Sequence, residues 1–170
     1  MNYAGIIKVD TANGLGCRVT LFVSGCDHHC KGCQNPQTWD CNYGKEFNVL
    51  TIDKILGYMN HDYIKGLSLS GGDPLKKENI PCVLQLLKGT KRVYPEKDVW
   101  CWTGDTWEQL MQRSDTKDVL RYIDVLVDGE FIESQKSLSL VWKGSANQRV
   151  LDVKKSLEFN HPVLYDYTSK

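Results

Sequence analysis

The sequence predicts an α/β fold with a mainly parallel sheet, formed by a single domain over residues 1–170. Short runs rich in β-branched and aromatic residues alternate with segments whose apolar residues recur at helical spacing. Polar, glycine-containing loops follow four of those runs, as expected where parallel strands end at a functional edge. A complete eight-fold barrel takes about 250 residues. The 170-residue chain therefore predicts a partial barrel or an open sheet.

The expected strands are short runs of Val, Ile, Leu and Trp bounded by turn residues. They cover residues 4–9, 17–24, 66–72, 97–104 and 122–129, with one or two further short strands after residue 138. The turn-like segment NGLG joins the first two, which indicates neighbouring strands.

Three helices are expected between these strands. The first has apolar residues at helical spacing between 52 and 59, with Thr51 as its N-cap, and the second between 80 and 87. Asp105 and Glu108 form the pattern of a capping box before a third helix over residues 107–111.

Charge and hydropathy exclude several classes of protein. The formal net charge is zero, so no basic surplus indicates nucleic acid or an anionic membrane as a partner. The first ten residues, MNYAGIIKVD, lack the basic and apolar regions of a signal peptide. No apolar run approaches the roughly 20 residues of a membrane span. We therefore expect a cytoplasmic protein that binds neither nucleic acid nor membrane.

The segment SGCDHHCKGCQNP, residues 24–36, contains three of the seven cysteines in the spacing C-x3-C-x2-C. An odd number of cysteines argues against a disulfide framework. Structural zinc prefers four ligands in separated pairs, and only one C-x2-C pair is present. An iron–sulfur cluster can take one thiolate at each of several irons. The spacing favours a four-iron cluster over zinc, with the fourth iron open to a non-protein ligand.

The remaining cysteines and the two nearby histidines have other interpretations. Cysteines in strand-like or helical runs fit small buried hydrophobes: Cys17, Cys82 and Cys101. The role of Cys41 stays open. His28 and His29 are interpreted as polar loop residues or as hydrogen-bond donors to cluster sulfurs, rather than as ligands.

The C-x3-C-x2-C loop followed by SGGDP at a strand end resembles the radical S-adenosylmethionine superfamily. The resemblance implies a partial (β/α) barrel with a mainly parallel sheet. It implies a [4Fe-4S] cluster whose fourth iron binds S-adenosylmethionine, with Cys26, Cys30 and Cys33 as ligands. The implied contacts to S-adenosylmethionine come from Gly32, Cys33, Gln34, Gly71, Gly72 and Asp73. No acid–base catalytic residue is assigned, because the cofactors supply the chemistry.

Five segments resemble, in the same order, the activating enzymes of anaerobic (class III) ribonucleoside-triphosphate reductase. They are NGLGCRVTLFVSGCDHHCKGCQNPQTW, LSLSGGDPL, DVWCWTGDTWEQL, IDVLVDGEF and WKGSANQR. Gly32, before the last cysteine of the cluster, is also similar to this family. The resemblance implies that a one-electron donor such as a flavodoxin reduces the cluster. S-adenosylmethionine is then cleaved to a 5'-deoxyadenosyl radical, which generates a glycyl radical on the reductase.

Two alternatives remain open at this stage. One is an activating enzyme of another glycyl-radical protein, such as the pyruvate formate-lyase type, which resembles the chain in CxNPxTW but is considerably longer. The other is a non-catalytic metal-binding module. Thr103, Gly104 and Asp128 either help to seat a nucleotide or cap strand ends, and GSANQR, ending at Arg149, either meets a cofactor or partner or forms a plain turn.

Overall fold

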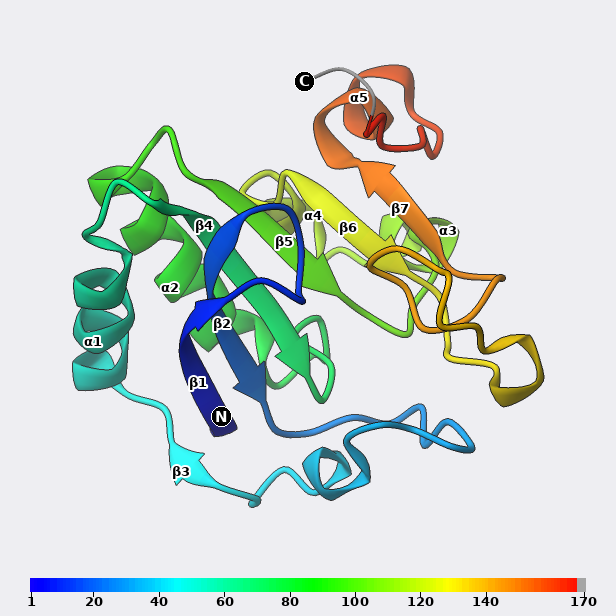
Figure 1. Cartoon of the computed structure of the whole chain (residues 1–170), viewed down its shortest axis with the longest axis horizontal. Helices are drawn as coiled ribbons and strands as arrows, with labels where there is room; N and C mark the ends of the chain where they lie inside the picture. Colours follow the sequence, from blue (N-terminus) through cyan, green and yellow to red (C-terminus); the bar gives the residue numbers. More distant parts are fainter. Residues whose placement is uncertain (168–170) are drawn as a thin grey trace.

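The computed structural model describes residues 1–167 and shows one sheet of seven strands, in the order β3-β1-β2-β4-β5-β6-β7 (Figure 1). The strands are β1 (Asn2–Asp10), β2 (Cys17–Val23), β3 (Lys45–Glu46), β4 (Ile64–Gly71), β5 (Asp98–Trp102), β6 (Val125–Asp128) and β7 (Arg149–Asp152). All five strands expected before residue 130 are present. Of the strands expected after residue 138, the described chain contains β7 alone as a named strand.

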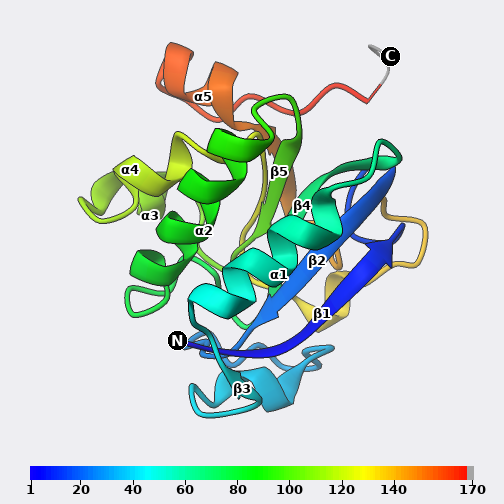
Figure 2. The same cartoon turned by 90° about the vertical axis from the view of Figure 1, so that its left-hand side faces the viewer.

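The helices flank the sheet. They are α1 (Val49–Met59), α2 (Ile80–Val93), α3 (Trp107–Gln112), α4 (Lys117–Leu120) and α5 (Val153–Phe159), with 3-10 helices at Pro36–Trp39 and Glu133–Gln135. Figure 2 shows α1, α2 and α4 on the same side of the sheet. No helix among residues 1–167 combines the length and apolar character needed to cross a membrane.

The sheet is mixed, with a parallel centre and antiparallel edges. The three central pairings, β2 with β4, β4 with β5 and β5 with β6, are parallel. The three outer pairings, which involve β1, β3 and β7, are antiparallel. The expectation of a mainly parallel sheet is thus confirmed for the centre, whereas the pairings at the edges are antiparallel. Helical crossovers connect the central strands, whereas the hairpin-like entry at residues 11–16 reverses the chain direction.

The parallel strands end at a common edge, because Val23 at the end of β2 lies opposite Gly71 at the end of β4. The expected loops leave from this edge: the cysteine loop (residues 24–35), the β4 loop (residues 72–79), the β5 loop (residues 103–106) and the β6 loop (residues 129–132). Parallel strands bring segments that are far apart in sequence to one side of the molecule.

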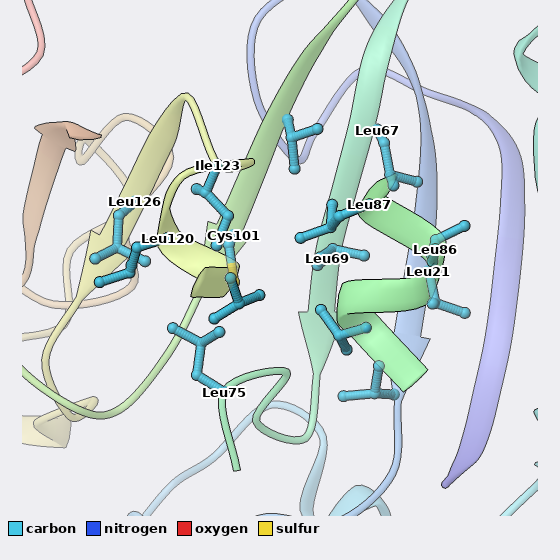
Figure 3. Packing of buried hydrophobic residues seen from close by; sticks show 14 of the residues in the cluster. Leu21, Leu67, Leu69, Leu75, Leu86, Leu87, Cys101, Leu120, Ile123 and Leu126 are labelled. Carbon is cyan, nitrogen blue, oxygen red and sulfur yellow. The ribbon is translucent and has the colours of Figure 1, made fainter. Parts of the chain in front are cut away.

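The central strands are buried on both faces. Their alternate residues point toward the helices and join one hydrophobic cluster, which includes Leu21, Leu67, Leu69, Cys101 and Leu126. Figure 3 shows Leu86 and Leu87 of α2 packed against this face. Near-continuous apolar runs are typical of strands covered on both sides.

The opposite face is covered by aromatic side chains rather than by helices. Trp100 is fully buried there with Val125 and Val127, and Trp102 and Trp142 pack against them. The buried Arg18 guanidinium lies over the Trp100 ring, 5.4 Å from its centroid, and pairs with Asp98 at 2.6 Å. A buried cation requires such partners, because desolvation alone disfavours its charge.

Two expected helix starts are wrong by one to three residues. The N-cap of α1 is Asn48, and Thr51 is instead the N3 residue whose side chain completes the capping box. The box at α3 is formed by Thr106 and Gln109 rather than by Asp105 and Glu108. Both boxes satisfy amide groups that the first helical turn leaves free.

The central strand β4 gives a stability prediction. Leu67→Ala removes a fully buried side chain and should lower the free energy of unfolding by about 2–5 kcal/mol. The matched control is Leu138→Ala, because the side chain of Leu138 is 96% exposed and should change stability by less than about 0.5 kcal/mol. Urea unfolding measures both. Equal losses would show that the core does not lie where the structure places it.

Candidate metal centre

The cysteine loop is attached at its base to the end of β4. The amide of Gly25 donates to the carbonyl of Thr38 at 2.7 Å. The amides of Gly72 and Asp73 donate to the carbonyls of Val23 and Gly25, both at 2.8 Å. The loop therefore leaves the sheet in a fixed direction, directly over the β4 loop.

The three clustered thiols are free, and each is partly exposed. Each sulfur also receives main-chain amide groups. The donors are the amides of His28 and His29 for Cys26, of Phe131 for Cys30 and of Asn35 for Cys33, the last at 3.4 Å. Amide donors of this kind stabilise thiolates and tune the potential of iron–sulfur clusters. The donor set thus fits a cluster ligated by sulfur.

Burial raises the pKa of Cys26 to about 11 and raises the pKa of Cys30 above its ordinary value. Both are therefore protonated thiols at neutral pH, and a metal must displace their protons to bind. Among residues 1–167, no three or more His, Cys, Asp and Glu side chains are grouped so that they could hold a metal ion. The ligand role of Cys26, Cys30 and Cys33 stays a prediction. It rests on the chemistry of the donors, one thiolate for each of three irons.

Asp73 joins three of the loops at this edge. Its side chain is buried, and Oδ2 accepts hydrogen bonds from Thr103 Oγ1 at 2.9 Å and from the amide of Gly104 at 3.2 Å. The same oxygen lies 3.0 Å from His28 Nε2, and Oδ1 accepts from the amide of Leu75 at 2.8 Å. Three of these four contacts are made by Oδ2 and one by Oδ1, so the hydrogen bonds are concentrated on Oδ2.

Gly71 and Gly72 allow the cysteine loop to approach β4. A Cβ at Gly71, where φ is +99°, would lie 2.7 Å from the carbonyl oxygen of Val23. A Cβ at Gly72 would lie 2.6 Å from that of Gly25. The close approach that requires glycine is therefore an approach of backbone to backbone. A contact of Gly71, Gly72 or Asp73 with S-adenosylmethionine stays a prediction.

Gly32 and Gln34 lie on the outer part of the loop. Gly32 has a φ of +73°, and a Cβ there would lie 2.8 Å from Glu133 Oε1. Gln34 is exposed, and the turn before it is closed by the amide of Cys33 donating to the carbonyl of Cys30 at 3.1 Å. Their contacts with S-adenosylmethionine also stay predictions.

The structure gives the two histidines different environments. His28 Nε2 faces Asp73, its Nδ1 lies 3.0 Å from Glu130 Oε1, and Nε2 is 3.8 Å from Asp105 Oδ1. The hydrogen bond to Asp73 outweighs burial and raises the pKa of His28 to about 9. His29 is exposed and lies 3.0 Å from the carbonyl of Asp27. The sequence did not separate them, because the partners of His28 are 45 and 102 residues away.

Asp128 and Arg149 bind protein groups beside a cavity of about 350 Å³. Asp128 is almost fully buried and accepts from the amide of Trp107 at 2.7 Å and from Arg149 Nε at 3.0 Å. Arg149 Nη1 also donates to Glu108 Oε1 at 3.0 Å. These contacts favour the interpretation in which the strand-end residues cap neighbouring elements.

The other cysteines follow the expected pattern in part. Cys101 is buried and free, and Cys17 and Cys82 are half-buried against the core. Cys41 is exposed, and its Sγ would lie 3.0 Å from a Cβ placed at Gly25. Cys41 therefore lies beside the start of the cysteine loop.

Comparison with known proteins adds two findings. A family model described as a 4Fe-4S single cluster domain matches residues 12–151. Three proteins named anaerobic ribonucleoside-triphosphate reductase-activating protein are similar over most of the chain. The protein of Vibrio cholerae is 48% identical over 87% of this chain and 96% of its own length. The protein of Escherichia coli K12 is 45% identical over 88% of this chain and 97% of its own length. The protein of Enterobacteria phage T4 is 41% identical over 88% of this chain and 93% of its own length.

Gly104 gives a prediction about packing at the site. A Cβ there would lie 2.3 Å from a ring carbon of His28, so Gly104→Ala should lower the free energy of unfolding by about 1–3 kcal/mol. Gly57 in α1 is the matched control, because nothing lies within 4 Å of a Cβ there. Gly57→Ala should be neutral or stabilising by up to about 1 kcal/mol. Urea unfolding compares the two, and a neutral Gly104→Ala would contradict the packing of His28.

The Glu108–Arg149 pair gives a pH prediction. The hydrogen bond from Arg149 lowers the pKa of Glu108 to about 2, so the stabilisation is present above the ordinary value of about 4.5 and is lost as pH falls toward 2. Glu108→Gln should therefore cost less than about 1 kcal/mol at pH 6, because the pair is half-exposed. The difference from wild type should shrink between pH 4.5 and 2.5 in urea titrations. A difference that grows with acidity would contradict it.

Proposed function

Because the chain belongs to the family of anaerobic ribonucleoside-triphosphate reductase-activating proteins, we propose that it is an iron–sulfur enzyme that reductively cleaves S-adenosylmethionine and generates the glycyl radical of that reductase. The observation that carries the proposal is the cysteine loop, whose three sulfurs each receive main-chain amides at the carboxyl edge of the sheet. The names of the relatives favour this reductase over another glycyl-radical protein.

When bound, a reduced [4Fe-4S] cluster supplies one electron, and S-adenosylmethionine supplies the 5'-deoxyadenosyl radical that removes a hydrogen atom from the glycine of the reductase. Within the chain, Cys26, Cys30 and Cys33 would hold the cluster. Hydrogen bonds at the base of the cysteine loop fix the direction of the loop. The loop would thereby orient the cluster, and orienting the cofactor is a main contribution of the protein to such chemistry. No side chain is required as an acid or a base.

The proposed contacts with S-adenosylmethionine come from the cysteine loop and from the end of β4 with the loop that follows it. They comprise Gly32, Cys33, Gln34, Gly71, Gly72 and Asp73. The buried negative charge of Asp73 suits the cationic amino group of the cofactor, and Oδ1 makes only one of the four contacts of this carboxylate within the chain.

The proposal also includes an architecture and a cellular setting. The open sheet with a parallel centre is interpreted as a partial barrel of the radical S-adenosylmethionine type, formed by one domain over residues 1–170. Seven free cysteines suit the reducing cytoplasm. A one-electron donor protein such as a flavodoxin reduces the cluster, and the reductase is the protein substrate.

The ligand set gives a direct prediction. Anaerobically reconstituted protein should contain about four irons per chain, as a [4Fe-4S] cluster requires. Cys26→Ala, Cys30→Ala and Cys33→Ala should each abolish the cleavage of S-adenosylmethionine under reducing conditions. Cys17→Ala and Cys82→Ala are controls that should retain most of it, since both side chains pack against the core. Stoichiometric zinc without iron would overturn the proposal.

The protein substrate is tested separately. The reduced protein, mixed with S-adenosylmethionine and the anaerobic reductase, should produce a glycyl radical detectable by EPR. The same mixture with Cys30→Ala should give no radical. Cleavage of S-adenosylmethionine without a radical on a competent reductase would indicate a different glycyl-radical substrate.

A further inference from the structure

We propose that His28 is a positioning residue that fixes the cysteine loop across the edge of the sheet, and thereby sets the position of the cluster relative to S-adenosylmethionine. The inference rests on the proposed function for the identity of the bound groups. The connection between loops that it describes belongs to the chain alone and can be measured without any cofactor.

The imidazole of His28 connects three loops at once. Nε2 lies 3.0 Å from Asp73 Oδ2 in the β4 loop, and Nδ1 lies 3.0 Å from Glu130 Oε1 in the β6 loop. Both ring nitrogens are therefore used, each toward a carboxylate from a different strand end. Asp105 of the β5 loop stands 3.8 Å from Nε2 and adds a third carboxylate. In Figure 1 the arrows of β2, β4, β5 and β6 point toward the side where the cysteine loop runs.

The imidazole ring of His28 is closely packed against the β5 loop. The His28 side chain is only 16% exposed. It lies against Gly104, where an added Cβ would meet three ring atoms at 2.3–2.6 Å. The amide of Gly104 donates to the same Asp73 oxygen that faces His28. Gly104 thus leaves space for the ring, because it has no side chain, and its amide helps to hold the Asp73 oxygen that the ring contacts.

The ion pairs made by Asp27 and Lys31, on either side of His28 in the loop, are weaker. Lys76 pairs with Asp27, but the Asp27 side chain is 74% exposed. Lys31 lies 3.4 Å from Glu133, and both are at least half-exposed. Exposed ion pairs contribute about 0–1 kcal/mol. The contact of His28 with Asp73 is more protected, because the Asp73 side chain is only 4% exposed. Among these three connections, that of His28 is therefore the one expected to restrain the loop most.

The position of His28 in the chain gives this restraint a consequence for the reaction. His28 is the second residue after Cys26 and the second before Cys30, so moving it moves two proposed ligands. Reacting groups misplaced by about 1 Å can cost on the order of a hundredfold in rate. A side chain that contacts neither cofactor can therefore control the geometry between them.

A competing interpretation makes the opposite prediction. His28 could occupy, in the protein without cofactor, the place at Asp73 that the amino group of S-adenosylmethionine takes. Removing His28 would then strengthen binding of S-adenosylmethionine. A positioning role predicts that binding weakens, so the sign of the change separates the two.

The first experiment uses the full-length protein without cluster. Hydrogen–deuterium exchange of peptides covering residues 24–35 and 103–106 should be about tenfold faster in His28→Ala. His28→Gln, which keeps one hydrogen bond donor, should be intermediate. His61→Gln is the control, since His61 is exposed at the opposite end of β4 and should leave both peptides unchanged. Unchanged exchange in a folded His28→Ala protein would overturn the inference.

The second experiment uses the reconstituted enzyme. His28→Ala should retain its iron but show an apparent KM for S-adenosylmethionine about tenfold higher, with a lower kcat. It should also weaken the change that S-adenosylmethionine causes in the EPR signal of the reduced cluster. His28→Gln should recover part of each. A lower KM would support the competing interpretation and overturn this one, as would wild-type values for KM and the EPR signal.

Glu130→Gln provides a second variant in case His28→Ala fails to fold. Glu130 is mostly exposed, so its substitution should be tolerated, and it should shift KM in the same direction by less. The double variant His28→Gln/Glu130→Gln should be less than additive, because both changes remove the same contact. Strictly additive effects of the two substitutions would contradict a contact between His28 and Glu130. If wild-type protein cleaves no S-adenosylmethionine, the proposed function fails while the exchange result still tests the connection.

Discussion

The buried carboxylate of Asp73 is the constraint on which the rest of the site depends. A buried charge is costly unless hydrogen bonds replace its water. Asp73 obtains them from the cysteine loop through His28, from the β5 loop through Thr103 and Gly104, and from its own loop through Leu75. Each donor lies on a segment that has no regular structure of its own. The requirement of a single carboxylate therefore determines how three separate loops are arranged.

The parallel centre of the sheet makes this arrangement possible. Three parallel pairings bring the ends of β2, β4, β5 and β6 to one edge, so loops far apart in sequence become neighbours. Burial on both faces, by helices on one side and by the aromatic cluster around Trp100 on the other, fixes the register of these strands. At the edge itself, Gly71 and Gly72 allow the backbone of the next loop to pass within hydrogen-bonding distance.

Features that depend on local sequence were predictable, and those that depend on distant partners were not. The central strands followed from their apolar runs, and α1 and α2 followed from helical spacing. Asn48 was missed as an N-cap because Thr51 is also a good capping residue and in fact completes the same capping box. The edge strand β3 has no distinct local signal, because it contains only two residues. The three cysteines were evident from their spacing, whereas the difference between His28 and His29 appears only when residues 73 and 130 are brought beside the loop.

The cysteine loop cannot organise itself, and this explains why its surroundings are so specific. Gly25, His29 and Gly32 all have positive φ, and the described loop forms no helix or strand between residues 24 and 35. Ordering such a segment costs on the order of 1–2 kcal/mol per residue in backbone entropy. Burial also keeps Cys26 and Cys30 protonated until a metal displaces the protons. If the loop were ordered only on metal binding, the cluster would have to offset both costs. Contacts within the folded chain, chiefly that between His28 and Asp73, already order part of the loop without metal. They therefore reduce the entropy cost of ordering the loop when the metal binds.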